Sequence, residues 1–130
     1  MKNKISFDFD DTLSFPDLQN YAKELIGRGF EVWIVTSRYQ DTTRYGFDIP
    51  KSSIGHKDLY KVANELGIPK EHITFTNFVE KSSFFEYDSN FICHLDDNSS
   101  EIALINRNTK VRGVDISVPG WKSKCETILK

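Results

Sequence analysis

The chain has 130 residues, of which 38% are hydrophobic and 13% aromatic; this length suits one domain, and the apolar content excludes a disordered polar chain. Seventeen basic against nineteen acidic residues give a net charge of −2, which excludes a positive field over the whole molecule as a basis for nucleic-acid binding. No apolar stretch approaches the ~18 residues of a membrane span, and the N-terminal segment Met1-Lys-Asn-Lys-Ile-Ser-Phe-Asp8 reaches charge too soon for a signal peptide. We expect a single soluble, cytoplasmic domain over residues 1–130, with no membrane association and no obligate protein partner.

Strand-like and helix-like segments alternate along the whole chain. Strand-like segments show alternating or continuous apolar residues, and helix-like segments repeat apolar residues every three or four positions. The first half predicts a strand over 4–10, a helix over 17–28 with Ser14 as its N-cap, a strand over 32–35, an irregular stretch over 37–57 and a helix over 59–66. The second half predicts strands over 73–76, 91–95 and 111–116, and helices over 79–87, from Asn98 or Ser99 through Ile105, and over 121–129.

This alternation predicts an α/β fold, a three-layer α/β/α sandwich whose central sheet is mostly parallel and is covered by helices on both faces. No segment between these elements is long enough for a second folded domain, so we expect no cap domain over the carboxyl ends of the strands. In such sheets the chemistry gathers outside the carboxyl ends of the strands, so polar residues that follow the strands are the candidates for a functional site.

Acidic residues follow two of the predicted strands. Asp8 and Asp10 end the first strand, where a spacing of two residues would point both side chains the same way about 7 Å apart, and Asp96 and Asp97 follow the fourth. Carboxylates gathered at one sheet edge raise one another's pKa unless a cation neutralises them, and hard oxygen ligands suit Mg²⁺. One Asp pair alone is better explained by turns and helix caps, but two pairs that both end buried strands favour a metal site.

The segment Phe7-Asp8-Phe9-Asp10-Asp11-Thr12-Leu13 resembles the DxDxT signature of the haloacid dehalogenase-like superfamily, most of whose members are Mg²⁺-dependent phosphatases. Three further features resemble the later motifs of that superfamily, and they follow in the same order over essentially the whole chain. These are the apolar strand that ends in Thr36, Lys81 near the start of the helix before the fourth strand, and the pair Asp96-Asp97.

The resemblance implies a covalent mechanism. Asp8 would attack phosphorus and form an aspartyl-phosphate, and Asp10 would act as general acid and then general base. Mg²⁺ would bind the Asp8 carboxylate, the Asp10 backbone carbonyl and Asp96 directly, with Asp97 acting through water, and would screen the charge between nucleophile and phosphate. Thr36 would hydrogen-bond a phosphate oxygen, and Lys81 would neutralise the nucleophile and the transferred group.

Several of these residues have plain structural alternatives. Thr36 could simply end a strand, and Lys57 precedes a helix and competes with Lys81 for the role of the catalytic lysine. Lys81 is favoured because it alone directly precedes the fourth strand. His94 lies inside that strand and is expected to be a satisfied core histidine.

A capless relative has an open site, so its specificity depends on loops. The segment 37–57 carries Arg38, Arg44, Lys51 and Lys57 against Asp41 and Asp48, with Tyr39, Tyr45 and Phe47 between the charges. Ser37, Arg38, Arg44 and Lys57, together with Thr36, are the predicted substrate-binding residues. Basic residues interleaved with aromatic rings suit a phosphate backbone and stacked bases, and packing of the rings against the sheet is an equal alternative.

The order of the motifs also resembles the phosphatase domain of phage-type polynucleotide kinases. The predicted function is therefore an Mg²⁺-dependent phosphomonoester hydrolase with a phosphorylated substrate, either 3′-phosphorylated nucleic-acid ends or nucleotides. The alternatives are a small-molecule phosphatase and a catalytically silent binding module that keeps this fold.

Overall fold

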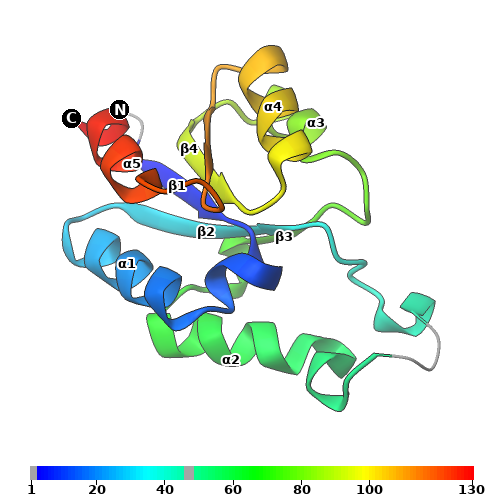
Figure 1. Ribbon diagram of the computed structural model, residues 1–130. Helices are drawn as coiled ribbons and strands as arrows, with labels where there is room; N and C mark the ends of the chain where they lie inside the picture. Colours follow the sequence, from blue (N-terminus) through cyan, green and yellow to red (C-terminus); the bar gives the residue numbers. More distant parts are fainter. Residues whose placement is uncertain (1–2, 46–48) are drawn as a thin grey trace.

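A five-stranded, all-parallel sheet forms the centre of the computed structural model, which describes residues 3–45 and 49–130 (Figure 1). The strand order is β3-β2-β1-β4-β5. The strands are β1 (Lys4–Phe7), β2 (Glu31–Thr36), β3 (Ile73–Phe75), β4 (Phe91–Asp96) and β5 (Arg112–Asp115). Every predicted strand is confirmed, with small differences at the ends.

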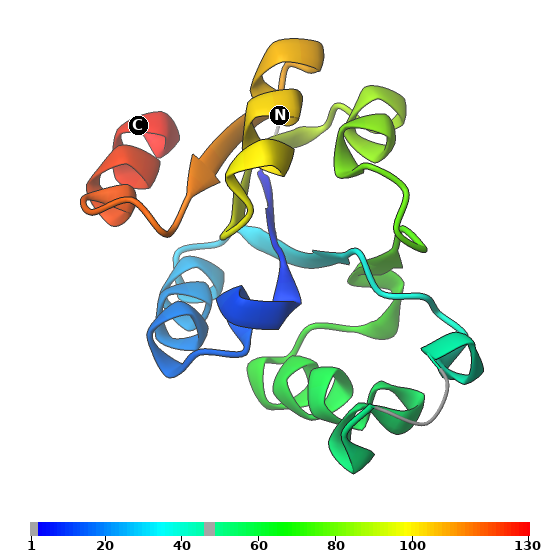
Figure 2. The ribbon, with the colours of Figure 1, turned by 45° about the vertical axis from the view of Figure 1, so that its right-hand side comes forward.

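Five helices cover the sheet. They are α1 (Pro16–Gly27), α2 (Lys57–Leu66), α3 (Lys81–Tyr87), α4 (Ser99–Asn108) and α5 (Trp121–Leu129). Helices α1 and α2 lie on one face, and α3 and α4 lie on the other (Figures 1 and 2). Cys125 of α5 packs in the same buried cluster as Leu25 of α1. The predicted three-layer α/β/α sandwich is thereby confirmed.

Side chains of β1 alternate between the two faces of the sheet. Ile5 and Phe7 belong to the larger buried cluster, on the side of α1 and α2, and a smaller cluster joins Phe85 of α3 to Ile105 of α4 on the other side. Within the described ranges, no helix combines the length and the apolar character that crossing a membrane requires.

The first strand ends earlier than predicted, at Phe7 instead of Asp10. The backbone turns tightly over Phe9–Leu13, where Asp11 adopts a left-handed conformation with φ of 56°. The amide of Leu13 closes this turn on the carbonyl of Asp8. Asp8 and Asp10 therefore follow the strand and do not belong to it, although both line the same cleft.

The predicted helix starts differ in outcome. The Ser14 hydroxyl accepts a hydrogen bond from the Asp11 amide and does not cap α1. That helix begins instead with Pro16 at its first position, where the missing N–H has no cost. Asn98 does cap α4, because its side-chain oxygen accepts from the amides of Ser100 and Glu101.

The segment 37–57 is more ordered than predicted. Its described residues form two single-turn helices, Thr42–Tyr45 and Lys51–His56, before α2 begins. Phe47 and Asp48 lie outside the described residues.

Candidate active site

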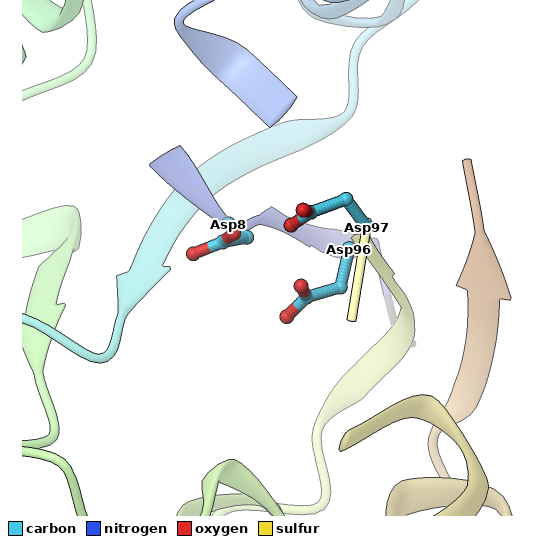
Figure 3. Close-up of side chains that lie close together, drawn as sticks. All are labelled: Asp8, Asp96 and Asp97. Atoms are coloured by element: carbon cyan, nitrogen blue, oxygen red, sulfur yellow. The ribbon is translucent and has the colours of Figure 1, made fainter. Parts of the chain in front are cut away.

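Three carboxylates meet at the carboxyl edge of the sheet, between β1 and β4 (Figure 3). Asp8 follows β1, Asp96 is the last residue of β4, and Asp97 comes next. One oxygen of each side chain lies within 4.8 Å of the others. The chain builds the sheet outward from β1 to β3 and then restarts on the other side of β1 with β4, so the cluster occupies the point of reversal, where ligands bind in open α/β sheets.

Lys81 joins two of these carboxylates. It is the first residue of α3 and only 1% exposed, and its Nζ donates to Asp8 Oδ1 at 2.9 Å and to Asp96 Oδ2 at 2.5 Å. Its backbone amide donates to Glu101 of α4 at 3.0 Å, which fixes the start of α3 over the sheet. A buried ammonium group beside the carboxylates offsets part of their mutual repulsion.

A chain of buried hydrogen bonds leads from Asp96 through His94 to Ser6. His94 Nε2 lies 2.8 Å from Asp96 Oδ2, and His94 Nδ1 lies 2.8 Å from Ser6 Oγ. Complete burial lowers the pKa of His94, so the ring is neutral, with Nε2–H donating to the carboxylate and Nδ1 accepting from the hydroxyl. The prediction of a satisfied core histidine is confirmed.

Burial and neighbouring charges shift the pKa values of the two carboxyl groups that Lys81 contacts in opposite directions. Burial raises the pKa of Asp8 to about 8, and Asp96 adds to this effect while Lys81 opposes it. Burial also raises the pKa of Asp96, but the hydrogen bonds from His94 and Lys81 outweigh it, and the pKa lies below its usual value. Asp8 is therefore the carboxyl group whose ionisation depends most on an additional cation.

Asp10 lies outside this cluster and pairs with Arg38 instead. Arg38 Nε donates to Asp10 Oδ2 at 2.9 Å, and Nη2 donates to Asp10 Oδ1 at 2.8 Å. On its other side Arg38 donates to both carboxylate oxygens of Asp58, at 2.9 and 2.7 Å. The Asp10 side chain is 57% exposed, against 27% for Asp58 and 9% for Arg38.

The carboxylates form the floor of an open cleft of about 370 Å³. Its polar lining includes Asp8, Asp10, Lys81, Asp96 and Asp97. Tyr45, Ile49 and Phe78 also line it and supply apolar surface. A cleft of this size, in which convergent polar groups are combined with apolar surface, is typical of a small-molecule site.

The predicted substrate-binding residues have different positions. Ser37 and Arg38 line the cleft, whereas Thr36 is fully buried and its hydroxyl accepts from the Arg38 amide at 3.3 Å. Arg44 lies over the ring of Tyr39, 4.3 Å from its centre. Lys57 lines a second cavity and is not among the residues of the cleft.

Sequence reasoning missed His56 and Phe78, which line the cleft, and Asp58, which binds the cleft residue Arg38. Asp58 stands in the first turn of a helix, where an acidic residue is ordinary. Phe78 is 60% exposed and has a φ of 61°, held by a hydrogen bond from its amide to the Ser37 carbonyl. No pattern in the sequence signals that turn, because both partners are backbone groups.

No protein-family model, curated protein or solved structure matches this chain. The superfamily resemblance described from the sequence stays a prediction. Chemically, the site combines three carboxylates that could hold a divalent cation, a buried lysine between two of them, and a fourth carboxylate on an arginine at the rim.

Proposed function

We propose that this protein is an Mg²⁺-dependent phosphomonoester hydrolase that works through an aspartyl-phosphate on Asp8. The observation that carries the proposal is the bridge from Lys81 Nζ to Asp8 and Asp96, with Asp97 at the same edge. A carboxylate that is to attack a phosphate dianion needs cations on both sides of the transferred group. Lys81 is one such cation, and the three carboxylates suit a second.

The donor set fits Mg²⁺. Asp8, Asp96 and Asp97 offer only carboxylate oxygens, which this hard cation prefers. On Asp96, Lys81 and His94 use both lone pairs of Oδ2, and the Asn98 amide uses one of Oδ1, so one position on Oδ1 is left for a metal. The ion would supply charge screening and orientation of the phosphoryl group.

The residues of the chain would divide the work as follows. Asp8 forms the bond to phosphorus, and Lys81 neutralises the charge that gathers on Asp8 and on the equatorial oxygens. His94 and Ser6 keep Asp96 ionised and in place. Asp10, at the rim, gives a proton to the departing oxygen and later takes one from the attacking water.

The proposed substrate is a nucleotide or a 3′-phosphorylated polynucleotide end. Two features favour it over a small non-aromatic phosphate ester. The rings of Tyr39, Tyr45 and Phe78 lie together at the cleft, with centres 4.8–6.2 Å apart, and Tyr45 and Phe78 face into it. Exposed aromatic faces stack with bases of any sequence.

The second feature is a lysine groove, the cavity of about 520 Å³ lined by Lys57, Lys61 and Lys70 together with Tyr60. The segment 55–57 contributes to both cavities, since Gly55 and Lys57 line the groove and the intervening His56 lines the cleft. Lysines beside an aromatic ring suit the backbone of a single strand.

The decisive experiment is hydrolysis of an aryl phosphate with and without Mg²⁺, by the wild-type protein and by Asp8→Asn. Turnover that requires the metal and is lost in the variant is expected, since an amide cannot act as the anionic nucleophile. Undiminished turnover in Asp8→Asn would exclude the covalent mechanism. Absence of turnover on every phosphomonoester, with Mg²⁺ binding intact, would favour the binding-module alternative.

A further inference from the structure

The guanidinium group of Arg38 has all five of its N–H donors engaged. Nε and one N–H of Nη2 bind Asp10, and the second N–H of Nη2 and one of Nη1 bind Asp58. The remaining Nη1–H points to Nδ1 of His56 at 3.4 Å. An arginine has five such donors and no acceptor, so this side chain cannot bind a phosphate without releasing one of these three partners.

Asp58 is the more buried partner of Arg38, and Asp10 is the more exposed one. His56 Nε2 donates to the Gln40 carbonyl at 2.9 Å, which leaves Nδ1 to accept from Arg38. The Arg38 guanidinium also lies against the ring of Phe9, 5.1 Å from its centre. Burial raises the pKa of Asp58, but the Arg38 hydrogen bonds outweigh this and lower it, so the anchor is an ionised carboxylate.

We propose that Arg38, anchored by Asp58, is a positioning residue that holds Asp10 for the hydrolysis of the aspartyl-phosphate. The proposal rests on the proposed function and goes beyond it, because it assigns Arg38 and Asp58 to one half of the reaction. It also replaces the predicted role of Arg38 as a direct substrate ligand.

The chemistry of the two half-reactions explains this assignment. In the first, the Asp8 oxygen forms a bond to phosphorus, the bond from phosphorus to the leaving oxygen breaks, and protonated Asp10 gives its proton to that oxygen. In the second, water forms a bond to phosphorus, the phosphorus–Asp8 bond breaks, and ionised Asp10 takes the proton of the water. Both Asp10 oxygens accept hydrogen bonds from Arg38, so Arg38 holds the Asp10 side chain as a hydrogen-bond acceptor, which is the role that the carboxylate has toward water in the second half.

Arg38→Met and Asp58→Asn test the proposal with nitrophenyl phosphate, whose leaving group needs no proton. Slower hydrolysis of the phosphoenzyme lowers kcat and KM together and leaves kcat/KM unchanged. We expect kcat of Arg38→Met to fall at least tenfold, with a burst of one nitrophenolate per site and phosphoenzyme trapped by acid quenching. Asp58→Asn should show the same change to a smaller extent, because one acceptor for Arg38 remains.

Arg107→Met and Glu65→Gln are the matched controls, since both side chains are exposed and outside the cleft. Circular dichroism verifies that each variant is folded, and Asp58→Asn decides the matter if Arg38→Met unfolds. Equal losses in kcat and kcat/KM without trapped phosphoenzyme would overturn the proposal and place Arg38 in the first half-reaction, and a raised KM with unchanged kcat would return Arg38 to substrate binding. No turnover by the wild-type protein would instead refute the proposed function itself.

Discussion

Lys81 donates a hydrogen bond to Asp8 at 2.9 Å although the two residues are 73 positions apart in the chain. The contact exists because α3 begins over the carboxyl edge of the sheet, directly beside the end of β1. Both side chains are at least nine-tenths buried, so the charge on Lys81 is stabilised mainly by Asp8 and Asp96, while Lys81 opposes the effect of burial on the Asp8 carboxyl group.

Removing the charge of Lys81 should therefore affect both stability and activity. Lys81→Met leaves the buried, ionised Asp96 without its cation, and breaking a buried pair in this way costs about 3–5 kcal/mol. We expect a loss of this size in the free energy of unfolding by urea at pH 7, and loss of phosphatase turnover. Lys23→Met, on the exposed face of α1, serves as control and should change neither. A Lys81→Met protein of unchanged stability would show that the ion pair is not formed in solution.

The pKa of Asp8 predicts a dependence of stability on pH when no divalent cation is added. Its ordinary value is 3.8, and burial raises it to about 8 in the folded protein. Between these values the folded chain keeps a proton that the unfolded chain loses, so its stability falls as pH rises. The Asp8→Asn side chain does not titrate in this range, so the free energy of unfolding of the variant should increase relative to that of the wild type between pH 4 and pH 8.

The gain should exceed about 1.4 kcal/mol, the equivalent of one pKa unit. Unfolding curves of both proteins at pH 4, 6 and 8 in the presence of a chelator measure it. Added Mg²⁺ should remove the disadvantage of the wild type at pH 8, because the ion binds the ionised carboxylate. Parallel stability curves for the two proteins would mean that Asp8 titrates with its ordinary pKa.

The sequence was sufficient for the fold and for the acidic cluster, but not for the rim of the cleft. Apolar periodicity located the five strands and the helices α1 to α5, but not the two short helices within 37–57. The position of Asp8, Asp96 and Asp97 after parallel strands required that they meet at one edge. The pairing of Arg38 with Asp10 could not be predicted, because Asp10 lies in the tight turn that follows Phe7, where the sequence pattern indicated a continued strand.

The sequence assigns Asp96 as the direct metal ligand and Asp97 as a ligand through water. Asp97 is less buried than Asp96 and accepts a long hydrogen bond, 3.4 Å, from Thr12. Asp96→Ala should weaken Mg²⁺ binding more than Asp97→Ala, by about tenfold or more, because a directly bound carboxylate contributes more than a second-layer one. Titration calorimetry with Mg²⁺ measures both, and the reverse order would make Asp97 the direct ligand.

The substrate proposal predicts that a polynucleotide end is a better substrate than a mononucleotide. A 3′-phosphorylated oligonucleotide should be hydrolysed with at least tenfold higher kcat/KM than the matching nucleoside 3′-monophosphate, since each stacked base contributes about 1–3 kcal/mol. Replacing Arg44 and Tyr45 by Ala should reduce this advantage while leaving aryl-phosphate turnover nearly intact. Phe78→Ala should lower kcat/KM for both nucleotide substrates more than for a sugar phosphate, which has no ring to stack.

The lysine groove gives the sharpest form of this prediction, because its charges act only on a chain long enough to reach them. Replacing Lys57, Lys61 and Lys70 together by Gln should reduce kcat/KM for the oligonucleotide and leave the mononucleotide unchanged. Because each phosphate contact to a single strand contributes about 0.7 to the slope of log affinity against log salt, the variant should also be less sensitive to salt. Lys23, Lys110 and Lys124 are exposed and line neither cavity. Replacing these three by Gln removes the same charge and should leave kcat/KM for the oligonucleotide and its dependence on salt unchanged. If both triple variants lower kcat/KM for the oligonucleotide equally, the effect is one of net charge and the groove has no specific role. Equal kcat/KM for the two substrates in the wild type would instead leave a small-molecule phosphatase.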